Sequence, residues 1–332
     1  MANETVTFAN GKIICGRWKV LARLGTGGCG SVYKVEDTQR KGYIAALKAE
    51  AILKDDSGVL KLEAAVLKKL ADRKNVIRLL QSGKRSKYSF IVITICGSDL
   101  MSLRKKAQEG LSENTILRIG IYALYAIKQL HEIGFVHRDV KPGNMMNGAS
   151  GRDRRIIFLI DYGRMVRNFV VRDPKGISMR KPRKNVLLRG TLRYCSLGVH
   201  RRLEQGRVDD LWAMLYMLTE LYVGLPWNHL TVEKEIVKIK ENEPDENVFK
   251  ECPSEFISIA NYLRTLNYQD RPDYYKLYNW FMDVMKREKY SFSDQYEWEE
   301  ECTTTSKLDT AIDYSVREKS TKKSLDGSIQ RP

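Results

Sequence analysis

The chain has 332 residues, of which 57 are Lys or Arg and 41 are Asp or Glu, so its formal net charge is +16. This length allows one large two-lobed domain or two ordinary domains, and the charge favours anionic partners without naming one. The sequence has no run of the roughly 18 apolar residues that a membrane helix needs, and its scattered cysteines lack the spacing of a disulfide framework or a zinc site.

The N-terminal segment carries no targeting signal. Met1–Lys12 lacks the charged and apolar regions of a signal peptide, so we expect an intracellular protein, in the cytoplasm or the nucleus, without membrane insertion. Three β-like runs follow an extension of residues 1–15, at Trp18–Leu24, Ser31–Val35 and Tyr43–Ala49. Their short spacing predicts an antiparallel meander.

A glycine-dense turn separates the first two of these runs. It matches the pattern G-x-G-x-x-G through the residues Gly25, Thr26, Gly27, Gly28, Cys29 and Gly30. A strand and not a helix follows, which disfavours a dinucleotide-binding fold and favours a hairpin whose backbone amides cover phosphates. A flexible hairpin without a ligand remains the alternative reading of this motif alone.

Two charged residues interrupt apolar patterns in the next segment. Lys48 lies in the third β-like run, where an apolar residue is expected, and Glu63 lies within the apolar stripe of a predicted helix over Val59–Leu70. Each buried charge needs a counter-charge, so we predict a Lys48–Glu63 ion pair that aims the ammonium at phosphates. A further strand is predicted at Ser89–Ile95.

The remainder of the chain is mainly helical in pattern. Long helices are predicted from Ser112 to near Gly134, over Asp210–Tyr222 and over Glu255–Leu266, with a short strand at Ile156–Ile160. Residues 301–332 are rich in Thr, Ser and Lys and predict a disordered tail.

The strongest chemical signal is the segment from His137 to Asn144 followed by Asp161 at the end of an apolar run. Phosphoryl transfer needs a carboxylate beside the attacking hydroxyl and oxygen ligands for a metal. We assign the first role to Asp139 and the second to Asn144 and Asp161, because Mg²⁺ prefers hard oxygen donors. Lys141 can neutralise charge on the transferring phosphate.

Together these motifs form the protein kinase signature set. Smaller features resemble the casein kinase 1 group, namely Arg189–Ser196, Asp209–Trp212 and Leu225–Trp227. Val66–Leu70, Gly134–Phe135 and Tyr296–Glu299 are similar to the tau-tubulin kinase branch of that group. The resemblance covers roughly residues 16–300.

The resemblance implies an α+β bilobal kinase fold, with a small N-terminal antiparallel sheet and one main helix at residues 16–96 and a larger, mostly helical lobe at residues 97–300. It also implies the use of ATP and Mg²⁺ to phosphorylate Ser or Thr. Apart from the resemblance, we expect a monomer. The ATP site is expected to comprise Leu24, the glycine turn Gly25–Gly30, Val32, Ala46, Lys48, Glu63, Ile93, Thr94, Ile95 and Cys96. Ile93 takes the gatekeeper position, and Asp210 is expected to brace the catalytic loop from a buried helix.

The predicted substrate side is basic. Arg180, Arg183, Lys184 and Arg189 lie in the loop after Gly163, which favours acidic or phosphorylated protein substrates. A solvated basic face that promotes solubility is the competing interpretation. Thr231 stands where many relatives carry a second basic residue, so a need for a prior phosphate is left open.

Two other functional classes agree with parts of the sequence. An inactive pseudokinase scaffold is the main alternative, but Lys48, Asp139 and Asp161 are all present. A nucleic-acid-binding protein is supported by charge alone, since no nucleic-acid module is recognisable.

Overall fold

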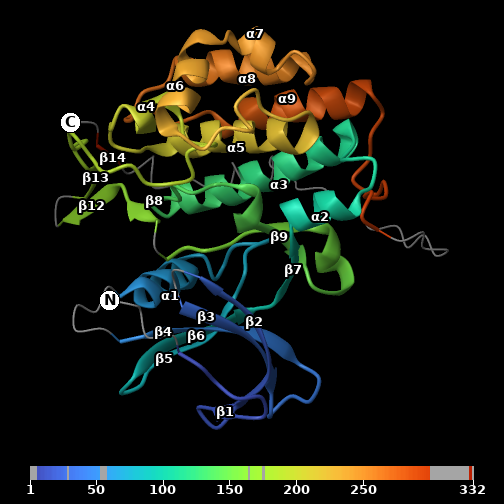
Figure 1. Cartoon of the computed structure of the whole chain (residues 1–332). Coiled ribbons are helices and arrows are strands. Elements are labelled where there is room, and N and C mark those ends of the chain that lie inside the picture. The colour runs from blue at the N-terminus through green and yellow to red at the C-terminus, as the bar shows by residue number, and fades with distance from the viewer. Residues whose placement is uncertain are drawn as a thin grey trace.

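The computed structural model describes residues 6–27, 30–52, 58–163, 165–173, 176–299 and 329–330. The predicted ligand contacts of Gly28 and Cys29, and nearly all of the predicted disordered tail, lie outside the described residues. Figure 1 shows two lobes, with the blue strands of the N-terminal half at one end and the stacked helices of the C-terminal half at the other.

The N-terminal lobe is a six-stranded sheet with the order β1-β2-β3-β4-β6-β5, and all neighbouring strands are antiparallel. Its strands are β1 (Ile13–Ile14), β2 (Trp18–Gly27), β3 (Gly30–Asp37), β4 (Ile44–Ala51), β5 (Leu79–Lys84) and β6 (Tyr88–Thr94). Burial alternates along β3, as the two-residue period of a half-buried strand requires. The predicted meander is confirmed, and β5 is a strand that the sequence pattern did not reveal.

One helix, α1 (Val59–Lys69), packs against this sheet and contacts β4, β5 and β6. Its buried face consists of Leu60, Glu63, Ala64, Val66 and Leu67. The helix therefore carries a carboxylate on an otherwise apolar face, as predicted.

The C-terminal lobe is built around α3 (Glu113–Glu132) and α5 (Arg207–Tyr222), which pack against each other. Figure 1 shows the other large helices layered around this pair. They are α2 (Leu100–Lys106), α4 (Leu197–His200), α6 (Glu233–Asn242), α7 (Asp245–Val248), α8 (Ser254–Arg264) and α9 (Tyr274–Arg287). Ser112 begins α3 by accepting a hydrogen bond from the Thr115 amide at 3.3 Å.

Short strands where the two lobes meet flank several of the predicted site residues. β7 (Cys96–Asp99), β9 (Met145–Gly148) and β10 (Ile157–Leu159) form one sheet, and β8 (Phe135–Val136) pairs with β11 (Arg167–Asn168). The short helices η1 (Pro142–Asn144) and η2 (Gly151–Arg155) flank β9, and β12 (Val170–Asp173), β13 (Gly176–Met179) and β14 (Ile329–Gln330) form the last sheet.

One large core links α1 to the helices of the C-terminal lobe, and a smaller core fills the outer face of the N-terminal sheet. The three predicted long helices are present, with ends that shift by a few residues. Among the described residues, no helix has the length and apolarity to cross a membrane.

Candidate active site

Lys48 is the meeting point of two carboxylates from distant parts of the chain. Its Nζ lies 2.8 Å from Glu63 Oε2 on α1 and 3.1 Å from Asp161 Oδ1, which follows β10. The predicted Lys48–Glu63 pair is confirmed. The additional contact brings Asp161, 113 residues away, to the same ammonium.

Lys48 and Asp161 favour their ionised forms, whereas burial raises the pKa of Glu63 against the opposing charge of Lys48. Burial lowers the pKa of Lys48, but the charges of Glu63 and Asp161 outweigh burial and raise the pKa above its ordinary value. Burial likewise raises the pKa of Asp161, and the Lys48 ammonium more than reverses this, so the net shift is downward. Asp161 is thus a carboxylate with a partly exposed side chain, at a left-handed φ of 68°. A strained backbone of this kind is often retained where a side chain must be aimed.

The segment after β8 places three further polar side chains together. Asp139 Oδ2 lies 2.8 Å from Lys141 Nζ, and Asn144 Nδ2 donates to the Asp139 backbone carbonyl at 2.8 Å and to Asp139 Oδ2 at 3.3 Å. Asp139 and Asn144 are buried, whereas Lys141 is partly exposed. Asp139 is therefore fixed from two sides.

Hydrogen bonds from buried side chains hold the segment from His137 to Asn144, which is the predicted catalytic loop. Asp210 on α5 accepts from the backbone amides of His137 and Arg138 at 2.7 Å each, and from His131 Nε2 at 2.8 Å. The predicted brace by Asp210 is confirmed. His137 Nε2 lies 3.0 Å from the carbonyl of Ile160, the residue before Asp161, so one histidine ties the Asp139 loop to the Asp161 turn. This agrees with a structural role for His137.

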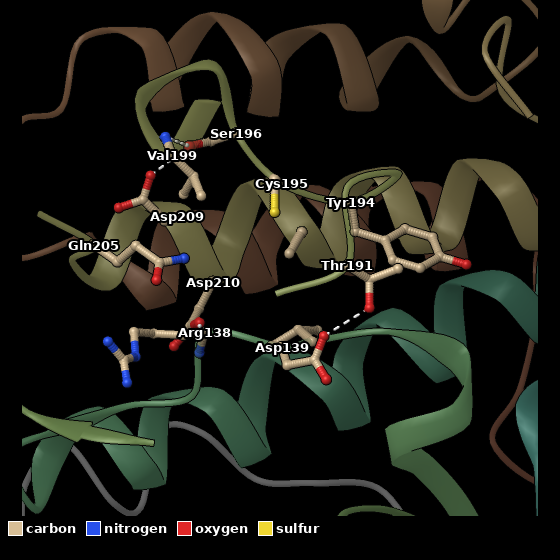
Figure 2. A pocket seen from close by; sticks show the side chains of 12 residues that line it. Arg138, Asp139, Thr191, Tyr194, Cys195, Ser196, Val199, Gln205, Asp209 and Asp210 are labelled. Atoms are coloured by element: carbon tan, nitrogen blue, oxygen red, sulfur yellow. Dashed lines mark hydrogen bonds between the residues drawn. The ribbon is translucent and has the colours of Figure 1, made fainter. Parts of the chain in front are cut away.

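Thr191 is a site residue that the sequence interpretation missed. Its hydroxyl donates to Asp139 Oδ1 at 2.8 Å, and Lys141 Nζ donates to the Thr191 hydroxyl oxygen at 3.3 Å. Figure 2 shows the Thr191–Asp139 hydrogen bond beside Cys195 and Tyr194 in a small pocket. The adjacent Gly190 has φ 112°, and a Cβ there would lie 2.6 Å from the Arg138 carbonyl, so the two loops approach closely only because of this glycine.

The predicted nucleotide side is formed by the N-terminal sheet. β2 and β3 meet at the glycine turn, where Gly25 pairs with Val32 and Gly27 with Gly30. Leu24 and Thr26 are exposed at the turn. On the strands, Val32 lies opposite Lys48 and Ala46 opposite Ile93. These predicted residues therefore lie on adjacent strands with Lys48.

In the segment between the lobes, some of the backbone groups expected at the ATP site already have partners. The Thr94 amide donates to the Arg78 carbonyl at 3.0 Å, so this donor is already engaged inside the lobe. Ile93 is buried, Ile95 and Cys96 are partly buried, and Cys96 begins β7. Of the backbone groups expected at the ATP site, the Thr94 amide is therefore already engaged, and Cys96 pairs with Gly148 on β9.

The donor set fits a hard divalent cation that also binds phosphate. Both side-chain hydrogen bonds of Asn144 among the described residues use Nδ2, which leaves Oδ1 as a metal donor alongside the Asp161 carboxylate. No group of three or more His, Cys, Asp or Glu side chains that could hold a metal occurs within the described ranges. A cation held by only one amide and one carboxylate needs further oxygen ligands, which is the usual situation of Mg²⁺ bound with a nucleotide.

The loop that carries the predicted substrate-side cations approaches Arg138 at its end, through Gly190. Arg180, Arg183, Lys184 and Arg189 are all exposed. Arg183 Nε lies 2.5 Å from Glu204 Oε2, so its charge is already paired. Burial and the positive charges of Arg167 and Arg189 together lower the pKa of Arg138 to about 10, against the opposing charges of Asp210 and Glu204. Positive potential therefore reaches the residue next to Asp139.

The chain is similar to known proteins over nearly all of its described residues. Residues 18–282 match the family model of the protein kinase domain. A Caenorhabditis elegans protein named as a serine/threonine-protein kinase is 43% identical over 296 residues, covering 89% of this chain and 85% of that protein. A protein of the same organism named as a casein kinase I is 32% identical over 308 residues, covering 90% and 87%. A third protein of that organism, named as an inactive tau-tubulin kinase, is 34% identical over 252 residues, covering 72% of this chain and 87% of that protein.

Proposed function

Because the chain belongs to the protein kinase family and is a serine/threonine kinase, we propose that it uses ATP and Mg²⁺ to phosphorylate acidic or phosphorylated protein segments. The predicted bilobal fold and the resemblance to casein kinase 1 and tau-tubulin kinases are confirmed. The use of ATP and a divalent metal is general in this family; the choice of Mg²⁺ and of acidic substrates is our proposal.

The observation that carries the proposal is a continuous set of contacts from Lys48 to Thr191. Lys48 contacts Asp161, and the residue before Asp161 accepts a contact from the His137 ring. Asp139 lies two residues after His137 in the chain. Asp139 in turn contacts Lys141 and Thr191. A group that must orient a hydroxyl, a group that can bind a metal and an ammonium that can bind phosphates thus converge in one place.

Each residue then has a distinct chemical task. ATP would supply the transferable phosphoryl group, and the metal would neutralise part of its charge. Asp139 orients the substrate hydroxyl and accepts its proton, while Lys141 adds positive charge beside Asp139. Lys48, held by Glu63, is positioned for phosphate oxygens, and Asn144 with Asp161 would hold the metal.

Metal dependence and the variant Asp161→Asn test this assignment. We expect phosphate transfer to an acidic peptide to require added Mg²⁺ and to fall at least about 100-fold in Asp161→Asn, because a ligand for the phosphate-bound cation is lost. Phosphate incorporation is measured with Asp153→Asn, an exposed carboxylate on η2, as the control. Wild-type protein without turnover would favour the pseudokinase scaffold, a possibility raised by the relative named as inactive.

The acidic preference is supported by exposed cations close to the catalytic loop. The charge of Arg189 acts on Arg138, the residue before Asp139, and Arg180 and Lys184 are exposed on the same loop. Glu204 is paired with Arg183 and Arg167. An acidic or phosphorylated segment would relieve repulsion among these cations through charge-assisted hydrogen bonds.

Charge reversal of two of these residues tests the preference. Lys184→Glu with Arg189→Glu should raise the KM for an acidic peptide roughly tenfold, since each exposed pair contributes up to about 1 kcal/mol. The KM for a neutral peptide should change little. Lys238→Glu, exposed on α6, controls for net charge. Selection of basic flanks from a peptide library, or an unchanged KM, would contradict the preference while leaving kinase activity intact.

A further inference from the structure

Lys240 on α6 is a buried cation that the phosphate-transfer chemistry does not use. Its side chain is only 4% exposed, and its Nζ lies 2.6 Å from the Cys195 carbonyl, 3.1 Å from the Leu192 carbonyl and 3.4 Å from His200 Nε2. Among the described residues, no carboxylate is within ion-pair distance of this ammonium. Its partners are therefore backbone carbonyls and a ring nitrogen.

The hydrogen-bonding capacity of the ammonium is matched by its surroundings. His200 Nδ1 lies 3.0 Å from Glu233 Oε1, so a neutral His200 that donates from Nδ1 presents Nε2 as an acceptor to Lys240. Burial lowers the pKa of His200, which favours this neutral form. The three N–H groups of Lys240 then meet three acceptors, and the rings of Tyr216 and Trp227 lie 4.9 and 5.0 Å away.

Keeping a cation here costs folding free energy. Burial lowers the pKa of Lys240 to about 7, and a well-packed apolar side chain often stabilises such a position more than a buried charge. Neighbouring carbonyls have other donors: Trp227 Nε1 donates to the Arg193 carbonyl, and the Tyr194 amide donates to the Thr191 carbonyl. Among the described residues, Lys240 alone donates a side-chain hydrogen bond to both the Leu192 and the Cys195 carbonyl.

We infer that Lys240 is a positioning residue for catalysis, which acts by fixing the 191–195 turn so that the Thr191 hydroxyl meets Asp139 and Lys141. The turn has no regular secondary structure of its own, so its shape depends on the side chains that bind its carbonyls. Thr191 is its first residue, and its hydroxyl is 2.8 Å from Asp139 Oδ1. Because a small displacement of a positioning group lowers kcat, the effect of Lys240 should pass through Thr191.

A double-mutant cycle, measured as kcat, tests whether Lys240 acts through Thr191. This measurement rests on the proposed function. Lys240→Met retains the aliphatic stem and removes the donors; Thr191→Val removes the hydroxyl. We expect each variant to lower kcat about tenfold, with the KM for ATP nearly unchanged, and the double variant to be no slower than Thr191→Val. Lys238→Met, exposed on the same helix, should match wild type. Multiplying effects, or a wild-type kcat in Lys240→Met, would overturn the inference.

Amide hydrogen exchange gives a second measurement that needs no turnover. In Lys240→Met, the amides of Tyr194 and Cys195, which both donate to the Thr191 carbonyl, should exchange about tenfold faster than in Lys238→Met, while α3 is unchanged. Unchanged exchange overturns the inference even in an active enzyme, and faster exchange supports it even if the proposed function fails. If Lys240→Met does not fold, Lys240→Gln replaces it in both measurements, with the same deciding outcomes.

Discussion

Tyr162 shows how a residue next to the site can be structural. It follows Asp161, is fully buried, and its hydroxyl donates to the Leu159 carbonyl at 2.9 Å. The hydroxyl therefore faces the strand β10 and not the metal donors. Tyr162→Phe should lower the free energy of unfolding by about 1 kcal/mol, because a buried carbonyl loses its partner, and should keep kcat within about twofold. Denaturant unfolding and initial rates measure the two effects. A large fall in kcat with unchanged stability would place the hydroxyl in the chemistry.

Single residues differ in how well the sequence could predict them. Lys48 and Glu63 could be paired because each interrupts an apolar pattern and so needs a partner. Thr191 could not be assigned, since its contact with Asp139 joins residues 52 positions apart and an exposed-looking threonine carries no local signal. The sequence places Arg183 among the predicted substrate-side cations, but nothing in the pattern indicates that Glu204 pairs with it.

At the level of the hairpin, β2 and β3 depend on one glycine. Gly30 has φ 106°, and a Cβ at that position would lie 2.1 Å from the Ala49 carbonyl on β4. Gly25, in the same turn, has open space around the position of a Cβ. Gly30→Ala should destabilise the protein by roughly 1–3 kcal/mol and raise the KM for ATP, whereas Gly25→Ala should change stability by less. Thermal unfolding compares the two; equal effects would contradict this account of the hairpin.

The connection between α4 and α6 predicts a dependence on acid. Hydrogen bonds from Arg202 and then His200 hold the pKa of Glu233 at about 2, well below its ordinary value. A depressed carboxyl pKa stabilises the fold above the ordinary pKa, and this contribution is lost as the pH falls toward 2. Glu233→Gln should therefore be less stable than wild type near neutral pH, and the difference should shrink on acidification.

Denaturant unfolding at several pH values measures that difference. Glu235→Gln, an exposed change on the same helix, is the matched control. A gap between wild type and Glu233→Gln that widens as the pH falls would contradict the pairing.

Elements were predicted best where the apolar period is long and unbroken. The α3 pattern extends over twenty residues, and its helix is present almost as expected. The strand β5 was missed because it pairs with β6 through a bulge and has mixed polarity, and the small β8–β11 pair exists only through contacts between distant segments. These strands form by pairing with segments elsewhere in the chain, and a short stretch of sequence carries no signal of that pairing.

At the scale of the whole molecule, the proposed catalytic residues lie where the two lobes meet. Lys48 and Glu63 belong to the N-terminal lobe, while Asp139, Asn144 and Asp161 belong to the C-terminal lobe, and the Lys48–Asp161 contact joins the two sets. The order of motifs along the chain was sufficient to predict this meeting, because each motif is tied to a strand or a loop of a recognisable fold. The substrate side could not be fixed in the same way, since its cations lie on a loop whose partners are long-range.

The most direct measurement of the central claim is phosphate transfer by Asp139→Asn, with Asp153→Asn as control. The amide keeps the shape of the side chain and its contact with Thr191 but cannot accept the proton of the substrate hydroxyl. The account predicts a fall in kcat of at least about 100-fold in Asp139→Asn, with ATP binding retained, and wild-type rates in Asp153→Asn. Turnover by Asp139→Asn close to that of wild type would contradict it.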